Sequence, residues 1–214
     1  MIGILATGFG AFPGVADNPS AALMGALHRR APHFARLGID VSTHVLPVLY
    51  EGLGKRLAAL VKDVKPDAIL HFGVAARRDV ISVETCAHNR VSLEAADANA
   101  MRPKSHLLDE RGPETIRVRL PATQIVAKIR AAGIEAKISR DAGTYLCNAT
   151  LYDTLTSQSH LPVGFIHIPM PSHAASRSSR PHFAEIVAAA DIAIVAVAAY
   201  VRHTRALSAA PAIS

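Results

Sequence analysis

Pro66-Asp-Ala-Ile-Leu-His-Phe-Gly73 contains an apolar run that is typical of a buried strand. Ala68–Phe72 forms the run, with a proline before it and a glycine directly after it. The segment before it, Leu53–Asp63, has a helical pattern. Strands that alternate with helices favour a mostly parallel sheet covered on both faces. We therefore expect an α/β fold of three layers.

The same alternation extends in both directions from this strand. Asn18 is predicted to cap the first helix, with Pro19 in its first turn. Residues 93–113 are expected to form a loop. The sequence contains no internal repeat and no obvious linker, so we expect one domain, 1–214. The other predicted strands are Ile2–Thr7, Val41–Val48, Val80–Val83, Thr115–Leu120, Ile134–Ser139 and Val163–Ile168. The other predicted helices are Ala21–Arg30, 121–132, Asn148–Ser157 and Phe183–Thr204.

The composition indicates a globular protein. Of 214 residues, 50% are hydrophobic and 19% are charged, and the net charge of +6 is scattered along the chain. With few aromatic residues and no Trp, we expect no nucleic-acid partner. Glu185 and Asp191 interrupt the apolar stretch Ala184–Val201, which is shorter than a membrane-spanning helix, so we expect no membrane partner.

The chain begins without the basic region of a signal peptide, and its two cysteines do not make a disulfide framework. We expect a cytoplasmic protein.

Cys147 is the first candidate for chemistry. It follows a predicted strand and the Gly-containing turn Asp141-Ala-Gly-Thr-Tyr145, and it precedes a predicted helix. The amides at a helix N-terminus lower the pKa of a thiol and can also hold an oxyanion. The alternative is a buried core cysteine, because free cysteines are among the most buried residues.

His167 lies near the end of the strand Val163–Ile168, where its side chain can reach a cleft and activate a thiol. A core histidine is the alternative, and His71 in another apolar strand competes for the role of base. Glu84 follows a short strand and can orient a histidine as the third member of a triad.

The loop Thr7-Gly-Phe-Gly-Ala-Phe-Pro-Gly14 follows the first strand. Its glycine spacing does not fit a dinucleotide site, and Phe9 and Phe12 better suit a small, flat ligand. His173 and His182 lie in a Ser/Arg-rich segment that predicts a mobile loop over the site rather than a metal site. We expect no metal and no cofactor.

These segments together resemble the pyroglutamyl peptidase I (pyrrolidone-carboxylate peptidase) family of cysteine peptidases. The resemblance runs in order through most of the chain. The most specific pieces are Asp141-Ala-Gly-Thr-Tyr-Leu-Cys147-Asn148 and Gly164-Phe-Ile-His167-Ile-Pro169. The other matching pieces are Thr7–Gly14, Asn18–Ser20, Val45–Val48, Pro66–Gly73, Ile81–Glu84 and Ala87–Asn89.

The resemblance implies that Glu84, Cys147 and His167 are a catalytic triad. It also implies that Phe9 and Phe12 enclose a pyroglutamyl ring, with Asn18 in the same binding loop. The fold it implies is an α/β sandwich with a mixed sheet, in which one edge strand is antiparallel. The implied enzyme is a cytoplasmic peptidase that needs no metal, acts on peptides with N-terminal pyroglutamate, and forms dimers or tetramers.

The chain departs from the family pattern near the expected pocket. Thr85 stands where the family usually has Arg, and Met170 stands where an aromatic residue is usual. Ala11 and Pro13 also differ, and Glu94-Ala-Ala-Asp97-Ala-Asn99 replaces a segment that helps to form the pocket. Two alternatives therefore stay open: a thiol hydrolase of another small cyclic amide or blocked amino acid, and a non-catalytic binding protein.

Overall fold

The computed structural model describes residues 1–172 and 179–209. A central sheet has the strand order β2-β1-β3-β8-β4-β7, and β5 pairs with β6 in a separate ribbon. The strands are β1 (Ile2–Phe9), β2 (Ile39–Leu46), β3 (Ala68–Val74), β4 (Ile81–Glu84), β5 (Cys86–His88), β6 (Thr115–Arg117), β7 (Ala136–Ser139) and β8 (Val163–Ile168). The helices are α1 (Pro19–Arg29), α2 (Ala31–Arg36), α3 (Leu53–Val64), α4 (Ala122–Ala131), α5 (Leu146–Ser157) and α6 (Phe183–Ala209).

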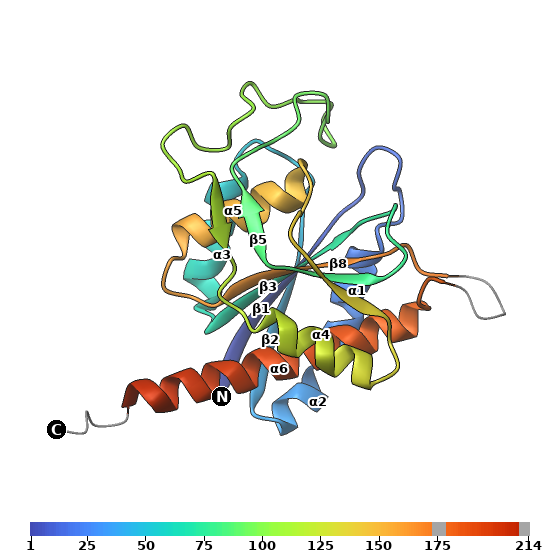
Figure 1. The fold of residues 1–214 in the computed structure, drawn as a ribbon, viewed down its shortest axis with the longest axis vertical. Coiled ribbons are helices and arrows are strands. Elements are labelled where there is room, and N and C mark those ends of the chain that lie inside the picture. Colours follow the sequence, from blue (N-terminus) through green and yellow to red (C-terminus); the bar gives the residue numbers. More distant parts are fainter. Residues whose placement is uncertain (173–178, 210–214) are drawn as a thin grey trace.

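Helices cover both faces of this sheet, which confirms the predicted three layers (Figure 1). Strand β1 shows why, because successive residues in a strand point to opposite faces. Ile4 of β1 belongs to the apolar core that includes residues of α1, α4 and α6, whereas Leu5 belongs to the core that includes residues of α3 and α5. Each face of the sheet therefore carries its own apolar core, and α5 lies over the second face.

The directions of the strands correct the prediction of one antiparallel edge strand. Strands β2, β1, β3 and β8 are mutually parallel, but β4 pairs with β8 in the antiparallel direction. Strand β7 pairs with β4 in parallel, so it is also reversed relative to β8. Two strands therefore run against the other four, and β4 lies inside the sheet rather than at its edge.

The sequence-based prediction missed two short elements and made one strand too long. Helix α2 and strand β5 were not predicted, because six and three residues are too few to show a period. Strand β6 ends at Arg117 instead of Leu120. Residues 93–113 contain no helix or strand, as predicted.

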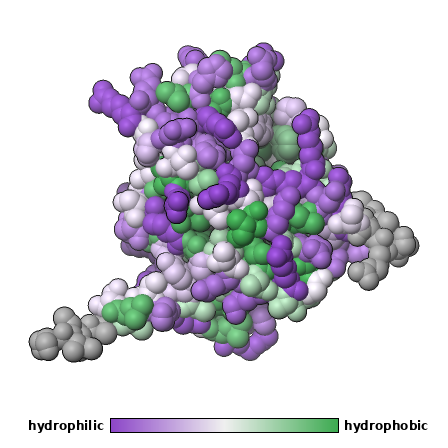
Figure 2. All heavy atoms as spheres, in the orientation of Figure 1, coloured by the Kyte–Doolittle hydropathy of each residue, from purple (hydrophilic) through white to green (hydrophobic). Residues whose placement is uncertain are grey.

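Helix α6 starts at Phe183 as predicted but continues past Thr204 to Ala209, and its end projects from the body of the molecule (Figure 1). By length and composition Phe183–Ser208 is apolar enough to cross a membrane, so the prediction that this stretch is too short was wrong. Half of its most apolar window is buried inside the protein, and core helices of soluble proteins pass the same test. The projecting end itself carries apolar atoms at the surface in Figure 2, and Leu207 is 63% exposed.

Candidate active site

Cys147 is the second residue of α5, in the first helical turn. Its Sγ lies over the backbone of Gly73 in β3, because a Cβ atom at position 73 would be only 2.8 Å from that sulfur. Gly73 pairs in register with His167 of β8. The thiol therefore lies beside the strand position that carries His167, and it reaches that place only because residue 73 has no side chain.

Glu84 reaches His167 through the antiparallel pairing of β4 with β8. Ser82 lies directly opposite His167, and Glu84, two residues further along, points to the same face of the sheet. The Nδ1 atom of His167 lies 2.8 Å from Oε1 of Glu84, and both side chains are buried. This hydrogen bond fixes the ring so that Nε2 is left for another partner. The carboxylate therefore reaches His167 across the sheet, from a strand that is antiparallel to β8.

Arg78 is a member of the site that the sequence analysis missed. It lies in the turn between β3 and β4 and donates from Nη1 to the same Oε1 of Glu84, at 2.7 Å. From Nη2 it donates to the carbonyl of Asp141, at the start of the turn that leads to Cys147. One guanidinium group therefore connects the carboxylate with the turn that carries the thiol. In the sequence, Arg77-Arg78 looked like any solvated basic pair.

The electrostatics of the site keep the cysteine and histidine neutral. Burial raises the pKa of the Cys147 thiol to about 12, and the Glu84 carboxylate adds to this rise. Burial also lowers the pKa of His167 below 6.5, more than its hydrogen bond with Glu84 raises it. The prediction that the helix N-terminus lowers the thiol pKa is therefore wrong, because desolvation outweighs the favourable helix end.

Glu84 remains ionised despite its position. Burial opposes its charge, but hydrogen bonds from His167 and Arg78 hold the pKa of the carboxyl below its usual value. The site at neutral pH therefore consists of a thiol, a neutral imidazole and a carboxylate. With these three groups in these protonation states, the proton passes from the sulfur to His167 only while the sulfur forms its bond to a substrate.

The three predicted ring-binding residues line one cavity with Cys147. This ring cavity has a volume of about 30 Å³, and it is bounded by Phe9, Phe12, Asn18, Val48, Val74, Tyr145, Leu146 and Cys147. Asn18 caps α1 as predicted and also donates from Nδ2 to the carbonyl of Gly10, which braces the loop. A cavity of this volume has room for only one or two water molecules, so the wall has to open to admit a five-membered lactam ring.

Tyr145 also lines the ring cavity, and the sequence analysis missed it. Its ring packs against Phe12 with centroids 6.0 Å apart, and its hydroxyl donates to the carbonyl of Ala96. Asp97, 1% exposed, anchors the same segment by accepting from the amide of Tyr50. The divergent segment Glu94–Asn99 therefore still shapes the cavity, although it does so through Tyr145.

The remaining sequence candidates lie elsewhere. His71, the other candidate for the base, is fully buried between the hydroxyls of Thr7 and Thr154, so it is a core histidine, and Glu84 hydrogen-bonds His167 instead. Cys86 is buried, with Sγ 3.2 Å from the carbonyl of Arg140. His173 falls outside the described residues, whereas the backbone amide of His182 donates to Glu185 at the start of α6. Within residues 1–172 and 179–209, no group of three or more His, Cys, Asp or Glu is arranged to hold a metal ion.

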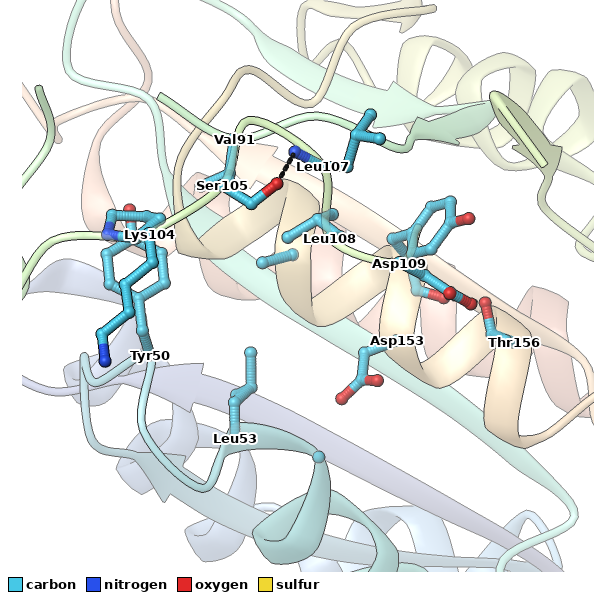
Figure 3. Close-up of a pocket in the computed structure, with 14 residues that line it drawn as sticks. Tyr50, Leu53, Val91, Lys104, Ser105, Leu107, Leu108, Asp109, Asp153 and Thr156 are labelled. Atoms are coloured by element: carbon cyan, nitrogen blue, oxygen red, sulfur yellow. Dashed lines mark hydrogen bonds between the residues drawn. The ribbon is translucent and has the colours of Figure 1, made fainter. Parts of the chain in front are cut away.

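A second cavity, of about 400 Å³, lies on another side of α5 (Figure 3). Asp153 and Thr156 of α5 face Leu108 and Asp109 of the long loop across it. Burial raises the pKa of Asp153. Tyr50 lines this cavity and packs edge-on against Tyr145, at 5.8 Å between ring centroids, so the two cavities have a wall in common. The residues described around this cavity include neither cysteine nor histidine, so it offers no nucleophile–base pair.

Comparisons with known proteins agree with this geometry. The sequence model of the pyroglutamyl peptidase family matches residues 2–200. A pyrrolidone-carboxylate peptidase of Oceanobacillus iheyensis is 34% identical over 186 residues, 85% of this chain and 91% of the relative.

Solved structures extend the likeness to the fold. Pyroglutamyl peptidase I of Bacillus amyloliquefaciens superposes with a TM-score of 0.82 at 29% identity, covering 94% of this chain and 98% of that one. Pyrrolidone carboxyl peptidase of Thermus thermophilus superposes with a TM-score of 0.79 at 32% identity, covering 90% and 99% of the two chains.

Proposed function

The chain belongs to the pyroglutamyl peptidase family of cysteine peptidases, and on that premise we propose that it removes N-terminal pyroglutamyl residues from peptides. The observation that carries the proposal is the buried hydrogen bond between Glu84 and His167, next to the strand position over which Cys147 lies. We assign Cys147 as the nucleophile, His167 as general base and acid, and Glu84 as the group that orients the imidazole.

The reaction begins as Sγ of Cys147 attacks the carbonyl carbon of the pyroglutamyl residue. Because the resting thiol is protonated, Nε2 of His167 takes its proton while the S–C bond forms. Glu84 stabilises the resulting imidazolium. His167 then gives the proton to the leaving amine as the C–N bond breaks. Water, deprotonated by His167, hydrolyses the thioester and restores the thiol.

The oxyanion and the ring have separate partners in this scheme. The first amides of α5 are unused within the helix and point at its N-terminal end, beside Cys147, where they can donate to the oxyanion. Phe9 and Phe12 contact the faces of the lactam ring in the ring cavity, and Asn18 holds the loop that carries Phe12. Substrate entry separates Phe12 from Tyr145.

A panel of blocked substrates tests this function. Pyroglutamyl, prolyl, acetyl-alanyl and larger cyclic-lactam amides of one fluorophore differ only in the group that enters the ring cavity. The proposal expects the pyroglutamyl amide to have the highest kcat/KM. If another cyclic amide is the best substrate, the protein is a thiol hydrolase of a different specificity. If a folded sample cleaves none of them, it is a binding protein.

Thr85, where the family usually has Arg, is not among the described residues that line the ring cavity, and its hydroxyl donates to the carbonyl of Ser139.

We also propose that the enzyme works in the cytoplasm and forms a homo-oligomer. The support for association is helix α6, on which Val195 and Leu207 are exposed to solvent. Light scattering of the purified protein tests it: a mass of one chain, 22.6 kDa, at micromolar concentration contradicts the proposal.

A further inference from the structure

A larger, mostly apolar cavity adjoins the ring cavity. We name it the Met170 cavity, and its volume is about 650 Å³. It is open to solvent between the loop after β1, the start of α1, and the segment that follows β8. The described residues that line it are Ala11, Ala16, Asp17, Asn18, Pro19, Ala21, Ala22, Met170, Pro171 and Phe183. Apart from Asp17 and Asn18, every one of them is apolar, so the cavity suits an apolar group.

One loop separates the two cavities. Ala11 lines the Met170 cavity, whereas the next residue, Phe12, lines the ring cavity. Asn18, at the other end of the same loop, lines both. A peptide whose first residue lies in the ring cavity therefore meets the Met170 cavity directly where the chain passes this loop.

The general acid shows which part of the substrate passes that way. His167 protonates the leaving amine, so the residue that follows pyroglutamate must lie on the side of His167. From His167 the chain runs through Ile168 and Pro169 to Met170, which lines the cavity. The Met170 cavity therefore lies on the leaving-group side of the scissile bond.

We propose that the Met170 cavity binds the side chain of the residue that follows pyroglutamate, and that it selects a large apolar side chain there. This inference rests on the proposed function. A phenylalanine or leucine side chain that enters the cavity removes a large apolar area from water, which stabilises binding. An alanine side chain removes little apolar area, so its binding is stabilised less. The exposed carboxylate of Asp17 at the cavity disfavours an acidic side chain.

Pyroglutamyl dipeptide amides with Phe, Leu, Ala or Glu in the second position measure this selection. We expect kcat/KM for the Phe and Leu amides to exceed that for the Ala amide by about 10–100-fold, with the Glu amide below Ala. Met170→Ala should lower the Phe/Ala ratio by about 3–10-fold, since several buried methylene contacts are lost. Asp17→Lys should raise kcat/KM for the Glu amide relative to Ala.

The matched control is Met101→Ala, which makes the same change at a methionine that is 55% exposed and outside the Met170 cavity. It should leave the Phe/Ala ratio as in the wild type. Equal kcat/KM for all four amides, or a Phe/Ala ratio unaffected by Met170→Ala, overturns this inference and leaves the proposed function intact. If no pyroglutamyl amide is cleaved at all, the proposed function fails and the inference fails with it.

Discussion

Arg78 is the residue whose role is easiest to isolate. Its charge lies next to Glu84 and lowers the pKa of His167. Without it, the imidazole binds a proton more readily, and the neutral base form of His167 appears only at higher pH. We expect Arg78→Met to reduce kcat/KM by about 10–100-fold, part of the 10²–10⁴-fold that a general base contributes. The acidic limb of the pH profile should move to higher pH.

The neighbouring Arg77 supplies the control for this experiment, because its side chain is exposed. Arg77→Met should keep the wild-type pH profile, and Arg78→Lys should recover part of the activity by restoring the charge. An unchanged acidic limb in Arg78→Met would mean that the guanidinium has only a structural role.

Single residues differ in how far their roles could be predicted. Cys147, His167 and Glu84 could be singled out because each has an unusual position relative to a strand or helix end, although their catalytic roles stay predictions. Arg78 could not, because a surface arginine has no local pattern that distinguishes it from a solvated charge. The pKa of Cys147 was also unpredictable, since it depends on burial by distant segments.

Among the elements, the packing of α5 against β3 is most sensitive at Gly73. A Cβ atom there would lie 2.7 Å from the ring of Phe165 and 2.8 Å from Sγ of Cys147. Gly73→Ala must displace the sulfur, so we expect kcat to fall by more than about tenfold and the free energy of unfolding by about 1–3 kcal/mol. Gly3→Ala is the control, because its nearest neighbour would be 3.8 Å away.

Activity and urea denaturation measure the two effects separately. Full kcat in Gly73→Ala would show that the sulfur does not need its position over β3.

Asn148 fixes the start of α5 to the ribbon β5–β6. It is fully buried, and its side chain accepts from the amide of His88 and donates to the carbonyls of His88 and Arg90. Asn148→Ala leaves these buried groups unpaired, so we expect a loss of about 2–4 kcal/mol in the free energy of unfolding. A loss below 0.5 kcal/mol, near the scatter of surface substitutions, would contradict this role.

The order of strands and helices could be predicted because apolar runs and their proline or glycine boundaries are local. Strand direction could not, because the reversal of β4 and β7 depends on how the chain crosses the sheet. Strand β5 could not be predicted either, because three residues are too few to show an alternating pattern of apolar and polar side chains. The single-domain organisation of 1–214 stays a prediction.

For the whole molecule, His71 makes stability depend on pH. Burial lowers its pKa to about 3, whereas an unfolded chain titrates its histidines near 6.5. As the pH falls below 6.5, only the unfolded state binds this proton, so folding stability is lost with acidification. Between pH 7 and pH 5 the loss from this group is about 2 kcal/mol, and His167 acts in the same direction.

His71→Gln removes this titration, so the difference in unfolding free energy between pH 7 and pH 5 should shrink by about 2 kcal/mol. The same change at the exposed His203 is the control. Urea denaturation at the two pH values measures both variants. An equal pH dependence in His71→Gln and the wild type would contradict this source of acid sensitivity.

The central claim is that Cys147 is the nucleophile of a pyroglutamyl peptidase. Alkylation of Cys147 is a poor test of this claim, because a thiol with a raised pKa reacts slowly with alkylating agents. The direct measurement is fluorophore release from a pyroglutamyl amide by the wild type, Cys147→Ala and Cys86→Ala, each shown to be folded by its melting curve. The account predicts release by the wild type and Cys86→Ala and none by Cys147→Ala. Release by Cys147→Ala at the wild-type rate, or no release by a folded wild type, would contradict it.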